Sequence, residues 1–295
     1  MDKKDIELLK ILFLESQYKS FEEIKNRYIE RNLDLQKIFN QENIPKHLQG
    51  LDKNSALLKL LSPLDIYSIV SVGIYNSYME NNMPLLNNSL FSYNRLNYNR
   101  DILFSSGTDH SRFFVSSLES FAGNDCSLII KMFPTEKGLT VQGDKFAVIS
   151  CNLIISMFHK KQDWLEKSIF NAEKYLTQKI GIFDKAVINY LVSLAKSNIE
   201  EASNWLFEIS KLYKKANFLH NFKNPFYKIF GLFIHGLHNF AYHTLPKSLF
   251  EKIEVPNHTV FWSEFSQYQK ENNFRIGEPV IIFDGELKNL NVVNQ

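Results

Sequence analysis

Residues 224–240 read NPFYKIFGLFIHGLHNF, with an apolar side chain at most positions. Asn224 is a residue type that caps helices and Pro225 suits a first turn, so one helix is predicted over 225–243. A helix that is apolar on nearly all sides belongs in the centre of a bundle. The stretch therefore predicts an all-α protein whose other helices surround this segment.

Regular helical patterns flank this segment, and they predict helices at 145–160, 163–179, 184–197, 199–216 and 259–272. Short links between the first four make consecutive helices antiparallel neighbours, which predicts stacked helical hairpins. Ala147-Val148-Ile149 recurs as Ala186-Val187-Ile188, and Trp164 and Trp205 follow in the second helices. This echo resembles a degenerate tetratricopeptide-like repeat, and an irregular helical bundle is the alternative.

Two further helices begin with clear start signals near the N-terminus. Ser20 followed by Glu23 is a capping box, which predicts a helix over 21–40. Ser62-Pro63-Leu64-Asp65 combines a cap, a proline in the first turn and an early acid, and it opens an apolar-faced helix through Met79.

The next elements are predicted from breaks and caps. The Asn-rich stretch 85–104 predicts a helix with a polar surface. Asp109 is predicted to cap a helix that Gly123 closes, and a shorter helix over 127–133 ends before Pro134.

The C-terminal segment 279–284 is rich in β-branched residues, which favours a short strand, with an extended arm as the alternative. Residues 1–105 are predicted to form an N-terminal helical region and 106–295 a C-terminal helical domain. The two parts are expected to pack as one unit.

The composition excludes several classes of protein. A chain that is 44% hydrophobic and 22% charged is globular. Only 11 Gly and 8 Pro among 295 residues are too few turn residues for a many-stranded sandwich or barrel. The net charge is +2 without a basic cluster, so no nucleic-acid partner is predicted. Lys160-Lys161 and Lys214-Lys215 lie near predicted helix ends, where they complement the helix dipole.

The sequence also predicts a soluble protein of the cytoplasm with no membrane partner. Its most apolar segment, Phe226–Tyr242, is interrupted by Lys228 and by three further polar residues, and it falls short of the roughly 20 apolar residues that span a bilayer. The N-terminus does not match a signal peptide. Cys126 and Cys151 are too few for a disulfide framework, which indicates a reducing compartment.

Four histidines lie close together in the sequence, at His220, His235, His238 and His243. His235 and His238 are three residues apart on one helix face, a spacing that suits a metal ion. His243 is rotated from His238 by about 140°, and no acidic residue occurs among the four. The preferred interpretation is therefore structural: the imidazoles hydrogen-bond backbone carbonyls or caps, and no metal or cofactor is predicted.

Other candidate sites also have structural explanations. Asp109-His110-Ser111 has the residue types of a nucleophile relay, but neighbouring helical side chains point apart and its Asp is a good N-cap. Cys151 is predicted to be a small core residue, and Glu200, Glu201 and Glu208 a solvated acidic face. No phosphate-binding loop or nucleophile elbow occurs. We predict no catalytic residues and no enzyme, and the partner-binding residues stay unknown.

A family resemblance adds a functional expectation. It is carried by Phe261-Trp262, by Phe265, and by three stretches: Met132-Phe133-Pro134 through Gly138-Leu139 to Phe146-Ala147-Val148; Phe218-Leu219-His220-Asn221-Phe222 with Asn224-Pro225-Phe226; and His235-Gly236-Leu237 followed by Leu245-Pro246. Over about residues 110 to 275, the chain resembles the immunity 49 family of bacterial polymorphic-toxin systems.

The resemblance implies an all-helical immunity protein that is encoded beside a toxin and neutralises it in the cytoplasm. Such a protein binds the toxin domain stoichiometrically and needs no catalytic residues. Two alternatives stay open: a helical-repeat adaptor in a housekeeping complex, and a metal-dependent enzyme that uses the histidine-rich helix. The oligomeric state, the toxin and the role of the first hundred residues are not predicted.

Overall fold

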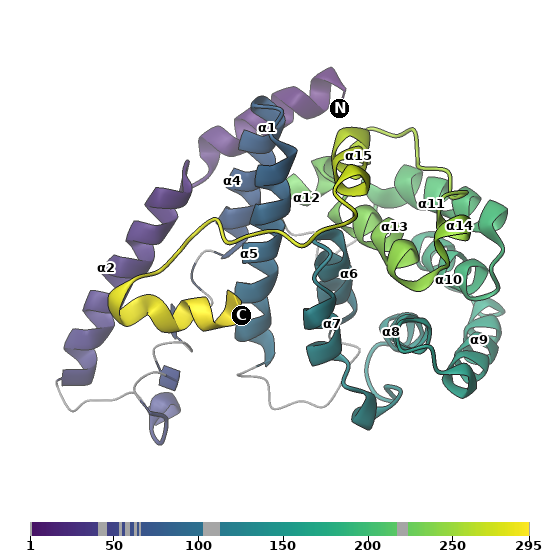
Figure 1. Ribbon diagram of the computed structural model, residues 1–295, viewed down its shortest axis with the longest axis horizontal. Helices are drawn as coiled ribbons and strands as arrows, with labels where there is room; N and C mark the ends of the chain where they lie inside the picture. The colour runs from purple at the N-terminus through teal and green to yellow at the C-terminus, as the bar shows by residue number, and fades with distance from the viewer. Residues whose placement is uncertain are drawn as a thin grey trace. The chain divides into compact units, whose positions relative to one another are not determined.

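The computed structural model describes residues 2–40, 46–52, 55–56, 60–61, 64, 66–102, 113–216 and 224–294. The regular structure of these residues consists of α-helices and short 3-10 helices, without a β-strand (Figure 1). The predicted all-α class is therefore confirmed.

The chain divides into two compact units. Unit 1 comprises Met1–Ile6 and Gly107–Arg275, and unit 2 comprises Glu7–Ser106 and Ile276–Gln295. The predicted division into 1–105 and 106–295 places its boundary at nearly the same point of the chain. It differs at both termini, because the first six residues belong to unit 1 and the last twenty to unit 2.

Unit 1 contains the helices α6 Phe114–Ala122, α7 Cys126–Met132, η3 Thr135–Lys137, α8 Lys145–Phe158, α9 Gln162–Leu176, α10 Ile182–Ala195, α11 Ile199–Tyr213, α12 Phe226–Ile229, α13 Leu232–Thr244, α14 Lys247–Phe250 and α15 Ser263–Glu271. The four helices predicted between residues 145 and 216 are confirmed, with ends that differ by at most three residues.

Helices α8 to α11 form two consecutive hairpins, α8 with α9 and α10 with α11, and α10 also packs on α8. The repeated Ala-Val-Ile triplets lie in α8 and α10, the first helix of each hairpin, as predicted. The Asp144 carboxylate accepts the Ala147 N–H at 3.1 Å and the Asn198 amide oxygen accepts the Glu201 N–H at 3.4 Å. Two helix starts are therefore set by side-chain caps that the sequence contains.

Helices α6 and α7 end close to the residues where the sequence predicted their C-termini. Gly123 closes α6, where its N–H donates to the carbonyl of Glu119, and α7 begins one residue earlier than expected. Helix α6 is described from Phe114 onward without a side-chain cap at Phe113, and the predicted cap Asp109 lies outside the described residues.

Helix α13 lies at the centre of unit 1, where every residue from Leu232 to Ala241 is buried. The Phe233 ring contacts three other aromatic rings, those of Phe114, Phe183 and Tyr213, at centroid distances of 5.6 to 6.4 Å. The prediction that this segment is the most enclosed helix agrees with its burial.

The single helix predicted over 225–243 is wrong, because the chain breaks between α12 and α13. Phe230 adopts an extended conformation with φ −97° and ψ 111°, and the Gly231 N–H donates to the Val260 carbonyl at 2.7 Å. The backbone at Val260 therefore takes up an N–H that a continuous helix would have used internally. Asn224 does act as predicted, since its side chain accepts the Phe226 N–H at 3.0 Å.

Helix α13 packs most extensively against α6, and the two backbones approach closely at Gly236. A Cβ atom at this position would lie 2.1 Å from the Leu118 carbonyl oxygen and 3.0 Å from the Leu118 Cα. Only glycine allows these helices to pack at this distance, because the obstructing atoms are backbone atoms of α6 and cannot rotate away.

Replacing Gly236 by Ala is expected to lower the free energy of unfolding by about 3 kcal/mol, because α6 and α13 have to separate. Gly181→Ala is the matched control, because Gly181 has a φ of −60° and its nearest non-neighbouring atom would lie 3.5 Å from the new Cβ. The control is expected to change stability by less than about 1 kcal/mol. Urea unfolding followed by circular dichroism measures both, and equal effects of the two substitutions would contradict this account.

Unit 2 contains most of α1 Lys3–Glu15, together with α2 Phe21–Asn40, η1 Lys46–Leu48, α4 Ile66–Met79, α5 Met83–Ile102 and η5 Gly285–Asn294. Helix α2 has its predicted bounds, and the Glu23 N–H donates to the Ser20 hydroxyl at 3.1 Å. Helix α4 ends at Met79 as predicted, whereas most of its predicted start signal, Ser62-Pro63-Leu64-Asp65, lies outside the described residues.

For residues 279–284 the extended arm, which was the alternative to a short strand, is confirmed. Residues 279–284 form an extended arm along α5, without strand pairing, and then lead into η5. The Glu278 N–H donates to the Asn88 side chain at 2.9 Å, and the Val280 N–H to the Ser92 hydroxyl at 2.8 Å. The helix predicted over 85–104 is confirmed as α5, but it lacks the expected polar surface: most of its described side chains are buried, because α4 packs against it and the arm bonds to its Asn88 and Ser92.

Candidate functional site

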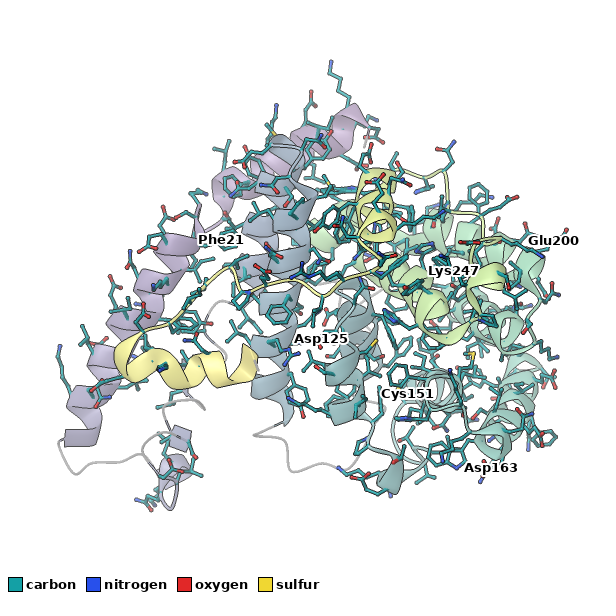
Figure 2. All side chains as sticks on the ribbon, viewed as in Figure 1. Phe21, Asp125, Cys151, Asp163, Glu200 and Lys247 are labelled. Atoms are coloured by element: carbon teal, nitrogen blue, oxygen red, sulfur yellow. The ribbon has the colours of Figure 1, made fainter. Side chains whose placement is uncertain are left out.

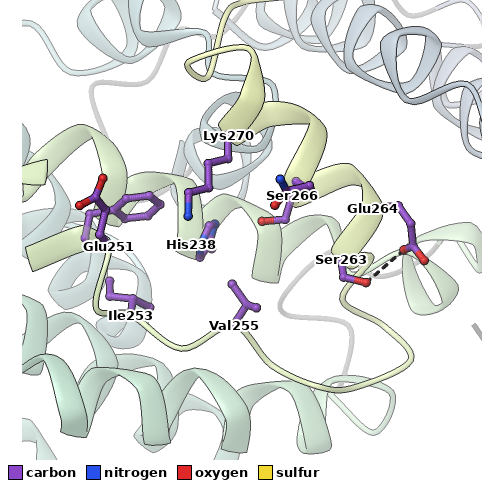
Figure 3. Close-up of a pocket in the computed structure, with 10 residues that line it drawn as sticks. His238, Glu251, Ile253, Val255, Ser263, Glu264, Ser266 and Lys270 are labelled. Atoms are coloured by element: carbon purple, nitrogen blue, oxygen red, sulfur yellow. Dashed lines mark hydrogen bonds between the residues drawn. The ribbon is translucent and has the colours of Figure 1, made fainter. Parts of the chain in front are cut away.

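A cavity of about 450 Å³ opens in unit 1 between α13, α14, α15 and the connection that follows α14 (Figure 3). Its inner side chains are buried, namely His238, Phe250, Ile253 and Ser266. Its outer side chains are exposed, namely Glu251, Val255, Ser263, Glu264, Gln267 and Lys270. The cavity thus has an enclosed end that contains an imidazole and an open end that contains charged groups.

The His238 imidazole is oriented by Asn239, whose side-chain oxygen lies 3.2 Å from His238 Nδ1. The Asn239 Nδ2 donates to the Phe121 carbonyl at 3.0 Å and to the Gln269 Oε1 at 3.0 Å, so the Asn239 oxygen is the group left to accept. Nδ1 therefore carries the hydrogen and Nε2 carries a lone pair. Nε2 makes no hydrogen bond to the part of the chain that the structure describes.

The same two amides close the C-terminal end of α6. Asn239 Nδ2 also approaches the Ala122 carbonyl at 3.3 Å, and Gln269 Nε2 donates to that carbonyl at 2.7 Å. The last carbonyls of a helix have no partner within it, so buried side-chain donors must satisfy them. Asn239 and Gln269 thereby connect α6, α13 and α15, and they hold the wall of the cavity that carries His238.

His235 is fully buried in a stack of aromatic rings. Its imidazole lies between Phe230, at 4.7 Å and 19°, and Phe261, at 4.3 Å and 15°. His235 Nε2 accepts the Trp262 N–H at 3.1 Å, and Nδ1 has no hydrogen-bond partner among the described residues. The ring therefore supports the connection that leads into α15.

His243 is held at the other end of α13, where its Nε2 lies 3.0 Å from the Asn124 Oδ1. Asn124 has a φ of 59°, so this contact holds the left-handed turn between α6 and α7. His220 lies outside the described residues. The sequence analysis predicted backbone carbonyls or caps as partners of these imidazoles. His235 does bond a cap residue, since Trp262 is the N-cap of α15, whereas His238 and His243 contact asparagine side chains.

Nowhere in the described ranges do three or more His, Cys, Asp or Glu side chains gather in an arrangement that suits a metal ion. His235 and His238 are near each other, as their spacing predicted, since both imidazoles contact the Phe261 ring, at centroid distances of 4.3 and 5.6 Å. Their hydrogen-bonded atoms, Nε2 of His235 and Nδ1 of His238, point to different protein partners.

Burial sets the protonation state of these rings. Removal from water lowers the pKa of His235 well below its usual value, and the neighbouring His238 lowers it further. The pKa of His238 falls to about 4, mainly through burial; the hydrogen bond with Asn239 opposes this and the Lys270 charge adds to it. Burial also lowers the pKa of His243 to about 4. All three rings are therefore neutral at pH 7.

These lowered pKa values predict a loss of stability in weak acid. Unfolded histidine has a pKa near 6.5, so below that pH the unfolded chain binds protons that the folded chain does not. Stability must then rise with pH across this window, and acidification from pH 6.5 to 5 is expected to cost about 2 kcal/mol per buried histidine. Urea unfolding at a series of pH values between 7 and 5 measures the slope.

His243→Gln is the matched variant for this prediction, because a glutamine amide can still donate to the Asn124 side chain. The free energy of unfolding of the variant is expected to fall less steeply on acidification. The difference should equal the loss of about 2 kcal/mol that one buried histidine causes. An unchanged slope in the variant would show that His243 does not contribute through its protonation.

The remaining candidates from the sequence lie apart from the cavity lining. Asp109-His110-Ser111 lies outside the described residues. Cys151 is fully buried within α8 (Figure 2), and burial, assisted by the Asp125 charge, raises the pKa of Cys126 to about 11. Neither cysteine forms a disulfide bond. The Cys126 thiol therefore lacks the low pKa of a reactive cysteine.

The predicted acidic face of α11 consists of surface groups. Glu200 and Glu201 are exposed in the first turn, and Glu208 forms an ion pair with Lys211 at 2.6 Å. The basic pairs also lie at helix ends as predicted. Lys214, at the end of α11, contacts both carboxylate oxygens of Asp5 at 2.5 and 2.6 Å.

Most of the cavity lining was not predicted from the sequence. Glu251 and Ile253 follow α14, and their approach to α15 depends on the path of the chain between the two helices. The sequence feature that could have indicated part of the lining is the spacing of Ser263, Gln267 and Lys270. It places three polar side chains on one face of a helix.

No protein-family model, no curated protein and no solved structure matches this chain. In the described ranges, none of the helices combines the length and the hydrophobicity that crossing a bilayer requires. The family resemblance over residues 110 to 275 therefore stays a prediction.

Proposed function

We propose that this protein is an immunity protein that neutralises a cognate bacterial toxin by stoichiometric binding in the cytoplasm. The residues that carry the resemblance support the proposal through their positions. Phe146, Gly236 and Trp262 are all buried in unit 1, where they contribute to the packing of α8, the crossing of α6 and α13, and the start of α15. The resemblance thus concerns residues that build one helical body.

The observation that favours protein binding is the exposure of large apolar side chains on the hairpins. Phe170 on α9 is 66% exposed and Ile182 at the start of α10 is 74% exposed. Charged residues of α9, including Glu166 and Lys174, surround Phe170 in the helical register. Exposed aromatic side chains within a polar surface are typical anchors of protein interfaces.

These features fit steric inhibition, in which the protein binds over the active site of the toxin. A specific complex buries roughly 1,600 Å² in total, and paired helical hairpins offer surfaces of that size. Because the chain carries a net charge of only +2, electrostatic attraction to the toxin has to come from local patches.

Co-expression with the toxin encoded beside this gene tests the proposal directly. Cells that produce both proteins are expected to survive, and the purified pair is expected to elute as one complex with equal amounts of each chain. Cells that die equally fast with and without this protein would refute the proposed function.

Truncation of Phe170 to Ala is expected to weaken the complex about 30-fold, because a central aromatic anchor contributes about 2 kcal/mol or more. The same substitution should leave the urea unfolding midpoint almost unchanged, since the side chain is mostly exposed. Calorimetric titration measures the affinity, and an unchanged dissociation constant would exclude this part of α9 from the interface.

A further inference from the structure

The enclosed end of the cavity contains a hydrogen-bond acceptor that the protein leaves unused. His238 is only 4% exposed and lines the cavity (Figure 3), and its Nδ1–H donates to Asn239, which leaves the Nε2 lone pair without a partner among the described residues. In contrast to Nδ1 of His235, this Nε2 atom is not fully buried, so it is open to the cavity, where a ligand that donates a hydrogen bond can reach it.

The charges around the cavity restrict what that group can be. Lys270 points toward His238 in Figure 3, and its charge lowers the pKa of the imidazole, so a second cation beside Nε2 is disfavoured. Glu251 and Glu264 line the open end and repel an anion that enters. A neutral donor satisfies both conditions, and the hydroxyl group also accepts a hydrogen bond, which the Lys270 ammonium can provide.

Apart from Ser266, the remaining inner surface is apolar and suits a flat ring. Phe250 lies beside the imidazole with a centroid distance of 5.1 Å, Ile253 lies at the same inner end, and Val255 extends the apolar lining to the open end. Aromatic rings gain from packing against an aromatic neighbour, and a volume of about 450 Å³ lies within the range of small-ligand sites.

We propose that this cavity binds a phenol group, with its ring against Phe250 and its hydroxyl donating to Nε2 of His238. The inference does not depend on the proposed toxin binding, because it rests on the lining of a cavity within unit 1. The phenol has two possible sources: a free small molecule, or a tyrosine side chain that a partner protein inserts.

The first experiment compares p-cresol with 4-methylanisole on the purified full-length protein. The two compounds share the ring, but the second cannot donate a hydrogen bond. Calorimetry and the imidazole ¹⁵N resonances of the protein are the readouts. We expect p-cresol to bind at least tenfold more tightly and to shift the resonance of the unprotonated Nε2 of His238. Equal binding of the two compounds, or no binding of p-cresol at millimolar concentration, would overturn the proposal.

A variant pair tests whether the cavity is the binding site. Val255 is 46% exposed at its open end, so Val255→Trp is expected to fill the cavity without disturbing the core and to abolish p-cresol binding. Val141→Trp makes the same change at a residue that is 85% exposed and does not line the cavity, and it should bind p-cresol like the unmodified protein. Undiminished binding by Val255→Trp would place the p-cresol elsewhere and refute the assignment.

The two sources of the phenol are distinguished by the same variant in the co-expression assay. If Val255→Trp loses both p-cresol binding and protection against the toxin, a tyrosine of the toxin is the ligand. If it loses p-cresol binding but still protects, the ligand is a free small molecule. If the unmodified protein binds p-cresol but does not protect cells against the toxin, the proposed function is refuted and the phenol site is not.

Discussion

The architecture of unit 1 depends on the close crossing of α6 and α13. At Gly236 the two backbones approach to a distance that excludes a Cβ atom, and Leu118 of α6 occupies the space. One turn further along α13, Asn239 reaches the carbonyls of Phe121 and Ala122 at the end of α6. Close packing at one point thus brings the amide within reach of the helix end, and the amide in turn holds the two helices in register.

The same crossing determines the chemistry of the cavity. Asn239 uses its Nδ2 for α6 and Gln269, so its oxygen is left to accept from His238. The tautomer of His238 and the exposure of Nε2 to the cavity therefore follow from how α6 ends. The packing of α6 against α13 thus determines, through the Asn239 amide, which nitrogen of His238 is available for a hydrogen bond in the cavity.

The success of the sequence analysis differs between local and long-range features. Helices α8 to α11 were predicted closely, because apolar periodicity and caps such as Asp144 and Asn198 act within a few residues. The break at Phe230 was missed, because it depends on a hydrogen bond from Gly231 to Val260, about thirty residues away in the sequence. Part of the burial of α5 was missed for the same reason, since the arm that bonds to Asn88 and Ser92 comes from the C-terminal segment of the chain.

The histidines show most clearly how much a spacing can reveal. The interval of three residues correctly places His235 and His238 near each other, but it contains no information about the segments that pack against them. Phe261 and Trp262, which follow the α14 region, enclose His235 and occupy its Nε2, whereas the chain from Glu251 to Val255 stands away from His238 and leaves a cavity. Two identical side chains on one helix face thus acquire different roles, because the residues that surround them come from a separate part of the chain. The residue type alone therefore does not define a candidate site. What matters is which polar atoms of the residue still lack a hydrogen bond to the rest of the protein.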